Sequence, residues 1–379
     1  MAEASLFDLP TDVLLDILHR LPPSTRRRLR LVCKLWRDGI DERTQERQVR
    51  TKILVFVTPN NSGGSSRALV FDGEDGHRRH PWAYLCSDKN RIRMVGTCNG
   101  LLCLHESRWP GGEPSTITVT NPITRETAAL PPAPAPPESE QFGKYSFGYH
   151  PTTGQYKVVH IPWREGRAAH AAALVFTLGG TSWRRVSALA APGAGYDRWC
   201  DAISVDGWTY WATASPDRRV IALDLNDERI TAFDAPPAAR LPAEARWRLT
   251  NVHARLGLVV TTETTLEVWM MEERGEQPRW SHIVDVRRWW QWHTAPQLTF
   301  GRDMLSSSYD VIHLPDDSMR GVWRVYRQEV GGLMDGKGKN GQLQPVKGKE
   351  LITEEDGFNG VLTTFAYVET LEPLPRIHG

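Results

Sequence analysis

The most restrictive feature of this sequence is the frequent recurrence of turn-forming residues from Thr51 onward. Short apolar or alternating runs are separated by clusters of Gly, Pro, Asn and Asp, and no helical stripe of comparable length competes with them. Runs of this length between turn residues are typical of β-strands. The sequence therefore predicts an all-β region of roughly 320 residues with many short strands. Examples are Ala68–Phe71, Gly100–Leu104, Thr116–Thr120, Tyr156–Ile161, Leu174–Leu178, Thr209–Ala212, Val220–Leu225, Gly257–Thr261, Leu266–Met271 and Val322–Tyr326.

One element recurs along this region: an apolar strand, a polar turn and a second strand that often carries Trp. Its marks lie roughly 45 to 57 residues apart, a spacing that suits four-stranded propeller blades of the kelch type. A single blade cannot bury its own faces, so blades must stack around an axis. We expect a β-propeller-like domain of about six irregular blades; a β-sandwich or a pair of sheets is the alternative architecture. The marks are Leu69–Phe71, Val119–Asn121, Val175–Thr177, Leu223–Leu225, Val268–Met270 and Val325–Tyr326.

The segment from Leu9 to Trp36 has the period of helices instead of strands. Apolar residues recur at i, i+3, i+4 and i+7 in two short stretches, and Pro22-Pro23 between them ends the first helix. Two short amphipathic helices bury little surface alone, so their apolar stripes need cover from the rest of the chain or from another protein. The two stripes are Leu14, Ile17, Leu18 and Leu21, and Leu29, Val32, Cys33 and Trp36.

The ordered residues of this segment resemble the F-box. This helical module docks the substrate-receptor subunit of a cullin–RING ubiquitin ligase on a Skp-type adaptor. One departure is that Arg26 and Arg27 stand where the family usually has leucine; we interpret the arginine run as a solvated helix face, not as a nucleic-acid site. The alternative is a helical hairpin packed on its own domain. The resemblance implies adaptor contacts through Leu9, Pro10, Leu14, Ile17, Leu18, Leu21, Pro22, Leu29, Val32, Cys33 and Trp36.

A second set of motifs resembles the F-box-associated repeats of plant F-box proteins. Together the two resemblances imply a mainly β protein with a helical F-box at 1–50, a propeller-like domain at 51–373 and a C-terminal tail at 374–379. They also imply a non-catalytic subunit of an SCF-type ubiquitin ligase, which reaches the cullin and RING subunits through the adaptor and binds a target protein with its β-domain. The motifs are Gly96–Cys103, Asn121–Thr124 with Leu130–Pro132, Phe147–Val159, Asp206–Trp211 and Phe365–Leu371.

A search for catalytic or metal-binding motifs finds none. Gly331–Lys337 has the spacing of a phosphate-binding loop, but Gly338 stands where Ser or Thr should hold magnesium. Neither HExxH nor GxSxG occurs, and we expect no catalytic residue, metal or cofactor. The histidines lack the spacing of metal ligands and are interpreted as surface or turn residues. They include His77, His80, His105, His150, His160, His170, His253, His282, His293 and His313.

Aromatic residues supply the candidates for target binding. Most tryptophans sit in strand patterns, where core packing is the default interpretation. One aromatic cluster does not fit simple core packing: Trp289-Trp290-Gln291-Trp292-His293. If it forms a strand, alternate side chains point to opposite faces, so the rings cannot all enter one core. Arg and aromatic side chains dominate interface hot spots. The alternative function is a ligand- or glycan-binding propeller module that acts without a ligase; an enzyme built on a propeller has no residue support. The candidate residues are Tyr196, Trp199, Arg287, Arg288, Trp289, Trp290, Trp292 and His293.

Bulk properties narrow the partners and the compartment. The 379-residue chain has a formal net charge of +1, so charge alone implies no nucleic-acid partner. No apolar run reaches the roughly 18 residues of a membrane span, and the first residues do not resemble a signal peptide. The five cysteines form no CxxC pair, which favours free thiols in a reducing compartment. We therefore expect a protein of the cytoplasm or nucleus.

Overall fold

The computed structural model covers residues 1–379 and describes strands, turns and six positions of the N-terminal segment. The described residues are Val13, Ile17, Thr25, Leu29, Val32 and Trp36, and residues 52–59, 65–71, 78–84, 90–108, 115–134, 143–162, 172–187, 200–213, 219–236, 245–252, 254–262, 265–275, 278–287, 295–300, 303–313, 319–329, 349–354, 360–371 and 373–374.

Strands dominate the described part of the chain. The first twelve are β1 (Lys52–Pro59), β2 (Ser66–Phe71), β3 (Arg78–Tyr84), β4 (Asn90–Cys98), β5 (Leu101–Arg108), β6 (Thr116–Asn121), β7 (Glu126–Ala129), β8 (Lys144–His150), β9 (Gln155–Ile161), β10 (Ala172–Thr177), β11 (Arg184–Ser187) and β12 (Ile203–Val205). The second twelve are β13 (Trp208–Ala212), β14 (Arg219–Asp224), β15 (Ile230–Asp234), β16 (Arg246–Val252), β17 (Arg255–Thr261), β18 (Thr265–Glu273), β19 (Arg279–Arg287), β20 (Ala295–Phe300), β21 (Asp303–His313), β22 (Met319–Glu329), β23 (Lys349–Glu354) and β24 (Gly360–Tyr367).

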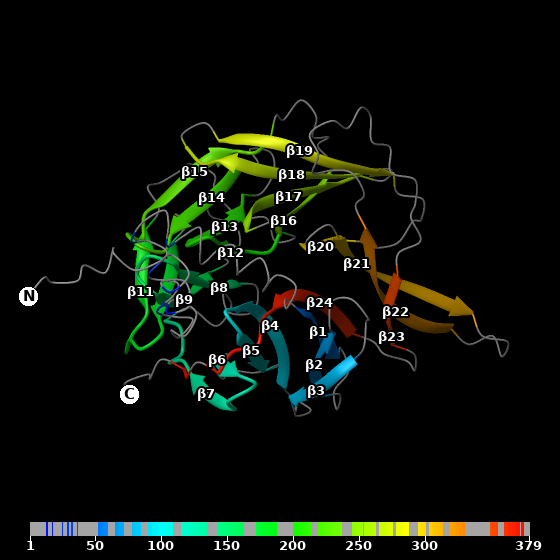
Figure 1. Ribbon diagram of the computed structural model, residues 1–379, viewed down its shortest axis with the longest axis horizontal. Helices are drawn as coiled ribbons and strands as arrows, with labels where there is room; N and C mark the ends of the chain where they lie inside the picture. Colours follow the sequence, from blue (N-terminus) through cyan, green and yellow to red (C-terminus); the bar gives the residue numbers. More distant parts are fainter. Residues whose placement is uncertain are drawn as a thin grey trace, which may run out of the picture.

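The strands form a β-propeller, as the sequence predicts. They pair into six four-stranded antiparallel sheets, which are arranged around a common axis (Figure 1). The innermost strands β24, β4, β8, β12, β16 and β20 contact one another in ring order, so the circle of sheets is closed. Each of the six recurring sequence marks falls on the third strand of its sheet. The repeat seen in the sequence is therefore the repeat of the sheets.

One sheet joins the two ends of the propeller. β24 pairs with β1 over eight residue pairs, from Lys52↔Tyr367 to Pro59↔Gly360, and β1 continues to β2 and β3. The last strand thus completes the sheet that the first strands begin. Without this pairing, β1 and β24 would each expose an unpaired strand edge. The pairing removes both edges and closes the ring.

Many of the strands whose burial is described are buried on both faces, which explains their near-continuous apolar runs. In β5, Leu101 and Cys103 face the sheet that follows in the sequence, whereas Leu102 and Leu104 face the sheet that precedes it. Both faces therefore need apolar residues, and the polar–apolar alternation of a half-solvated sheet is lost. Burial of each such side chain contributes about 1.5–3 kcal/mol.

The propeller tryptophans whose burial the structure describes pack as expected. Trp211, Trp247 and Trp269 are buried in the clusters between neighbouring sheets. Trp183, Trp208 and Trp280 are half-buried at their borders. Core packing therefore accounts for these rings.

Tight turns connect the inner strands to their neighbours. Asn99 and Gly100 have φ of 50° and 87°, and Asp206 and Gly207 have φ of 48° and 76°. Two successive positive φ values are the signature of a type I′ hairpin, which Asn-Gly and Asp-Gly favour. Residues 151–154 form the turn between β8 and β9. All three turns agree with the sequence.

Glycine at position 148 allows two inner strands to approach closely. A Cβ atom there would lie 2.7 Å from Cβ of Ser204 and 2.9 Å from Cδ1 of Leu225, too close for any side chain. Beside it, the Ser146 and Ser204 hydroxyls lie 2.8 Å apart. Ser204 and Thr209 hydroxyls are also 2.8 Å apart. These hydroxyls satisfy one another where β8 meets β12.

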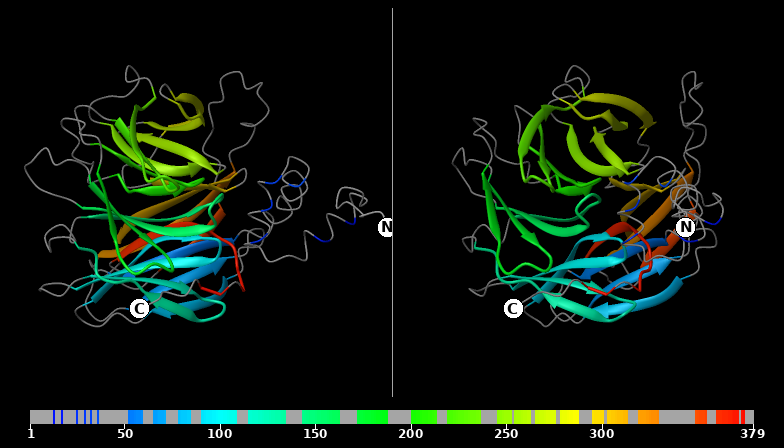
Figure 2. Two further views of the ribbon diagram at one scale, coloured as in Figure 1. Left: turned by 90° about the vertical axis from the view of Figure 1, so that its left-hand side faces the viewer. Right: turned by 60° about the vertical axis from the view of Figure 1, so that its left-hand side comes forward.

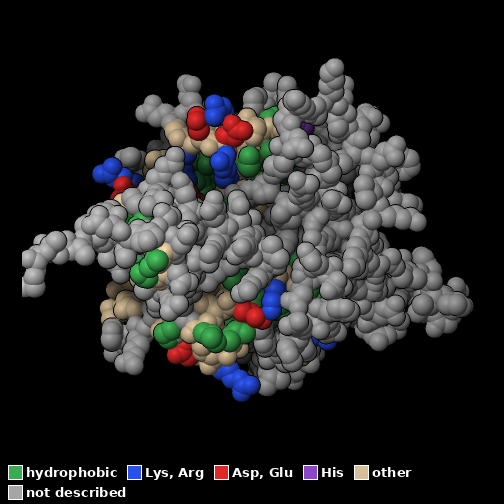
Figure 3. All heavy atoms as spheres, in the orientation of Figure 1, with side chains coloured by type: hydrophobic (Ala, Val, Ile, Leu, Met, Phe, Trp, Pro, Cys, Tyr) green, Lys and Arg blue, Asp and Glu red, His purple; other side chains and the backbone are tan. Residues whose placement is uncertain are grey.

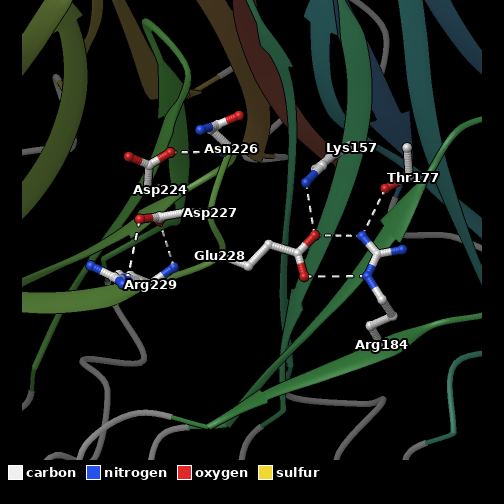
Figure 4. Close-up of polar contacts among 8 residues, drawn as sticks. All are labelled: Lys157, Thr177, Arg184, Asp224, Asn226, Asp227, Glu228 and Arg229. Carbon is white, nitrogen blue, oxygen red and sulfur yellow. Dashed lines mark hydrogen bonds and ion pairs between the residues drawn. The ribbon is translucent and has the colours of Figure 1, made fainter. Parts of the chain in front are cut away.

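A buried ion pair links the third and fourth sheets. Lys157 of β9 has a side chain only 4% exposed, and its Nζ donates to Oε1 of Glu228 at 2.7 Å. Arg184 of β11 binds the same carboxylate through both Nε and Nη2, and Nη2 also donates to the Thr177 hydroxyl (Figure 4). We call Lys157, Arg184 and Glu228 the Glu228 clasp. Burial alone would raise the pKa of the Glu228 carboxyl; the bonds from Arg184 and Lys157 outweigh it and lower that pKa.

Glu228→Gln should lower the free energy of unfolding by about 1.5–3 kcal/mol, because Lys157 would keep its charge in a buried site without a counter-charge. Asp227→Asn is the matched control: it lies in the same turn, its carboxylate is 44% exposed, and the change should stay within about 0.5 kcal/mol. Denaturant titration at neutral pH measures both. If the two variants lose equal stability, the clasp contributes nothing beyond a surface ion pair.

Candidate functional site

Six described positions represent the N-terminal segment. Val13, Ile17, Thr25, Leu29 and Trp36 are helical, and Val32 is in a turn whose amide donates to the Leu29 carbonyl at 3.1 Å. Figure 2 shows these positions, in dark blue, to one side of the stacked sheets.

Three of these apolar side chains are exposed. The exposed fraction is 45% for Val13, 44% for Ile17 and 58% for Val32. In the described propeller strands, by contrast, valine, leucine and isoleucine side chains are mostly buried. The described positions of the N-terminal segment therefore include apolar side chains that the chain itself leaves exposed.

The predicted adaptor contacts are only partly within the described residues. Ile17, Leu29, Val32 and Trp36 belong to the described positions, and Leu29 and Trp36 are half-buried. The other predicted contacts, and the atypical Arg26 and Arg27, lie outside them. Those other contacts are Leu9, Pro10, Leu14, Leu18, Leu21, Pro22 and Cys33.

The propeller has two unlike ends. We call the end where β1 begins the entry end; the turns at Gly100 and Gly207 lie there too, since each connects an inner strand to the second strand of its sheet. We call the opposite end, where the innermost strands β4, β8, β12, β16, β20 and β24 begin, the far end.

The C-terminal residues cross the entry end. After β24, Glu369 pairs with Lys52 at 2.7 Å, and the Asn121 side-chain amide donates to the Thr370 carbonyl at 3.1 Å. Thr370 lies so close to Gly100 that a Cβ there would be 2.5 Å from its methyl group. Leu374, where the predicted tail begins, packs on the core between the second and third sheets. The C-terminal residues are therefore held at the same end of the propeller as the start of β1, which follows the N-terminal segment.

Charges on the entry end are paired. Figure 3, which looks onto this end, shows blue and red side chains next to one another. Arg279 illustrates the pattern, with Nε 3.2 Å from Glu272 and Nη2 3.1 Å from Glu273. Among the described residues, this end has no large patch of side chains with the same charge.

Nearly all predicted target-binding residues lie outside the described part of the chain. Arg287 is the exception: it ends β19, where it pairs with Thr265. The aromatic patch stays a prediction. The residues outside are Tyr196, Trp199, Arg288, Trp289, Trp290, Trp292 and His293.

Among the described residues, the interpretation of the histidines as surface or turn residues is wrong at His105 and His160. His105 and His160 are 2% and 0% exposed. The Tyr145 ring lies between them, 4.7 Å from His105 and stacked 4.2 Å from His160. His150 is also buried, although it does serve a turn: its Nδ1 accepts the Thr153 amide at 3.1 Å. The only signal in the sequence was the placement of two of these residues next to long apolar runs.

Burial changes the acid–base behaviour of this stack. It lowers the pKa of His105 to about 3, with Arg93 and His160 adding to the effect. It lowers the pKa of His160 to about 4. Both imidazoles are therefore neutral at physiological pH, and the stack is part of the core between the second and third sheets. Among the described residues, no three His, Cys, Asp or Glu side chains gather as a metal site.

The fold places the chain among the β-propeller proteins, and comparison with known proteins narrows the class. Residues 49–321, more than half of the chain, match the F-box associated beta propeller domain, so the chain belongs to this family. Residues 6–44 match the F-box domain. Both resemblances seen in the sequence are thereby confirmed.

Relatives from Arabidopsis thaliana support the same family assignment. An F-box protein is 25% identical over 313 residues, covering 74% of this chain and 73% of the relative. An F-box/LRR-repeat protein is 26% identical over 323 residues, covering 76% and 71%. Among solved structures, a putative 6-phosphogluconolactonase from Bacteroides uniformis is 9% identical with a TM-score of 0.39, covering 83% of this chain and 99% of that one.

The histidine stack should make stability depend on pH. The unfolded chain binds a proton at each of His105 and His160 below about pH 6.5, whereas the folded chain does so only below about pH 3 and 4. Stability is therefore complete above about pH 6.5 and falls as the pH drops from there toward 4, by about 1.4 kcal/mol per pH unit per histidine. His160→Phe keeps a flat ring on Tyr145 and should remove roughly half of this slope.

Urea unfolding between neutral and mildly acidic pH measures the slope. A wild-type slope in His160→Phe would mean that the His160 imidazole is protonated in the folded state.

Proposed function

We propose that this protein is a substrate receptor of an SCF-type ubiquitin ligase: its F-box binds a Skp-type adaptor and its propeller binds a target protein. The observation that carries the proposal is the exposure of Val13, Ile17 and Val32 inside the segment that matches the F-box domain. An apolar helical surface that its own chain leaves open needs a partner.

The propeller supports the proposal that this chain binds a target protein. Its ring closes on itself, and the chain enters at one end, beside the fastened C-terminal residues. Such a body can hold a target in a fixed orientation to the adaptor. Ubiquitin transfer would then be accelerated by proximity, with the cullin and RING subunits reached through the adaptor and no catalytic residue in this chain.

The described cysteines fit a reducing compartment. Cys103 is a buried free thiol. No described helix has the length and apolar character to span a bilayer. We infer that the protein works in the cytoplasm or nucleus, which imaging of a fluorescent fusion tests.

Leu14→Asp combined with Ile17→Asp should abolish co-purification with the adaptor and cullin, since two carboxylates on the apolar stripe would need desolvation in the complex. Val32→Asp tests the second stripe independently. The matched control is Val368→Asp, which changes an exposed valine, 39% exposed, on the propeller instead. Adaptor recovery equal to wild type in both F-box variants would refute the docking assignment, provided thermal unfolding shows a folded propeller.

A further inference from the structure

The C-terminal residues hold an apolar side chain in the open on the entry end. Leu371 is 80% exposed, more than any other large apolar side chain whose burial is described. A single exposed leucine is ordinary on a protein surface. Leu371 differs because the chain is fastened on both sides of it. The Asn121 side-chain amide donates to the Thr370 carbonyl at 3.1 Å, and the Leu374 amide donates to Oε2 of Glu126 at 2.9 Å. Leu371 is therefore held in place on the surface.

Both fastening points belong to one turn. Asn121 ends β6 and Glu126 begins β7, so the C-terminal residues pass beside the turn between these strands. Asn121 also orders this turn, since its Oδ1 accepts the amides of Ile123 and Thr124 at 3.0 and 3.3 Å. Oε2 of Glu126 accepts the Thr124 hydroxyl at 3.0 Å. Two segments that lie 249 residues apart in the sequence are therefore held together at this point.

The two segments present apolar residues on the entry end. Pro122 and Ile123 of the turn are half-buried, and Leu371 and Pro373 are exposed. Figure 3, which looks onto this end, shows hydrophobic side chains gathered in its lower part. We call Pro122, Ile123, Leu371 and Pro373 the C-terminal patch. An apolar surface on segments that are already fixed suits a partner, because little ordering is needed when the partner binds.

The length of the chain keeps the F-box close to this patch. The F-box match ends at residue 44 and β1 begins at Lys52, which leaves the seven residues 45–51 between them. Seven residues span at most about 25 Å when fully extended. Lys52 itself lies beside the C-terminal residues, because its Nζ is 2.7 Å from Oε1 of Glu369, two residues before Leu371. A protein that binds the F-box is therefore held near the C-terminal patch.

We propose that the C-terminal patch is a second contact for the Skp-type adaptor, in addition to the F-box. This inference rests on the proposed receptor function and extends the adaptor surface to the propeller. Val13, Ile17 and Val32 of the F-box are exposed, as is Leu371, so the chain itself leaves both surfaces uncovered at these residues. One subunit that covers both fixes the direction in which the propeller points. A target or a second copy of this chain would have to share this end with the tethered adaptor.

Photo-crosslinking tests the contact directly. The full chain is co-expressed with a tagged Skp-type adaptor and carries the photoreactive residue p-benzoylphenylalanine in place of Leu371. Irradiation should give a product that contains both the chain and the adaptor. The same residue in place of Asp234 is the control and should give no adaptor product. Asp234 is 87% exposed and ends β15, the outermost strand of its sheet.

Variants measure the contribution of the patch through the rate at which labelled adaptor exchanges out of the purified complex. Leu371→Asp should weaken adaptor binding about tenfold, whereas Leu371→Met keeps an apolar side chain and should bind as wild type does. Glu126→Ala removes the acceptor of the Leu374 amide and should weaken binding several-fold, because Leu371 is then less fixed. Val368→Asp, outside the patch, is the matched control. Thermal unfolding establishes that each variant is folded.

Two outcomes would overturn the inference: a cross-link from position 371 only to a target, to a second copy of the chain or to no protein, and an exchange rate in Leu371→Asp equal to that of wild type. If either occurs while Leu14→Asp with Ile17→Asp abolishes co-purification, the receptor function stands and only the second contact fails. If the wild-type chain does not hold the adaptor at all, the receptor function fails as well.

Discussion

Closure of the sheet ring by β24 and β1 is the constraint on which the rest of the structure depends. Strands such as β5 are apolar on both faces, so every sheet requires a neighbour on each side. An open row of such sheets would leave two apolar faces in water; a ring leaves none. The eight residue pairs between β24 and β1 achieve this by joining segments more than 300 residues apart.

The same closure determines where the two ends of the propeller segment lie. Because β1 begins and β24 ends at the entry end, the N-terminal segment and the C-terminal residues leave the ring side by side. Asn121 illustrates the local chemistry: its Oδ1 accepts the Ile123 and Thr124 amides within its own turn, while its amide group donates to Thr370. The N-terminal segment therefore joins the propeller at the end opposite to the one where the innermost strands begin.

Many residues that carry the family resemblance are structural. Gly100 and Gly207 form hairpin turns with positive φ, and Gly148 allows β8 to meet β12. Asn121 both shapes a turn and fastens the C-terminal residues. The recurring motifs therefore specify how strands turn and how neighbouring sheets meet.

The sequence by itself determined the elements and their repeat. Strand positions follow from short runs between turn residues, Asn-Gly and Asp-Gly predict hairpins, and helical spacing separates the N-terminal segment from the rest; all of these are local signals. Only the tertiary structure decided which side chains meet. Lys157 and Glu228 are 71 residues apart, and the burial of His105 and His160 depends on Tyr145 of another strand. Likewise Lys144 and Asp201 form an ion pair although they lie 57 residues apart in the sequence. Contacts between different sheets leave no periodic trace in the chain, which is why the sequence indicated the strands and not their partners.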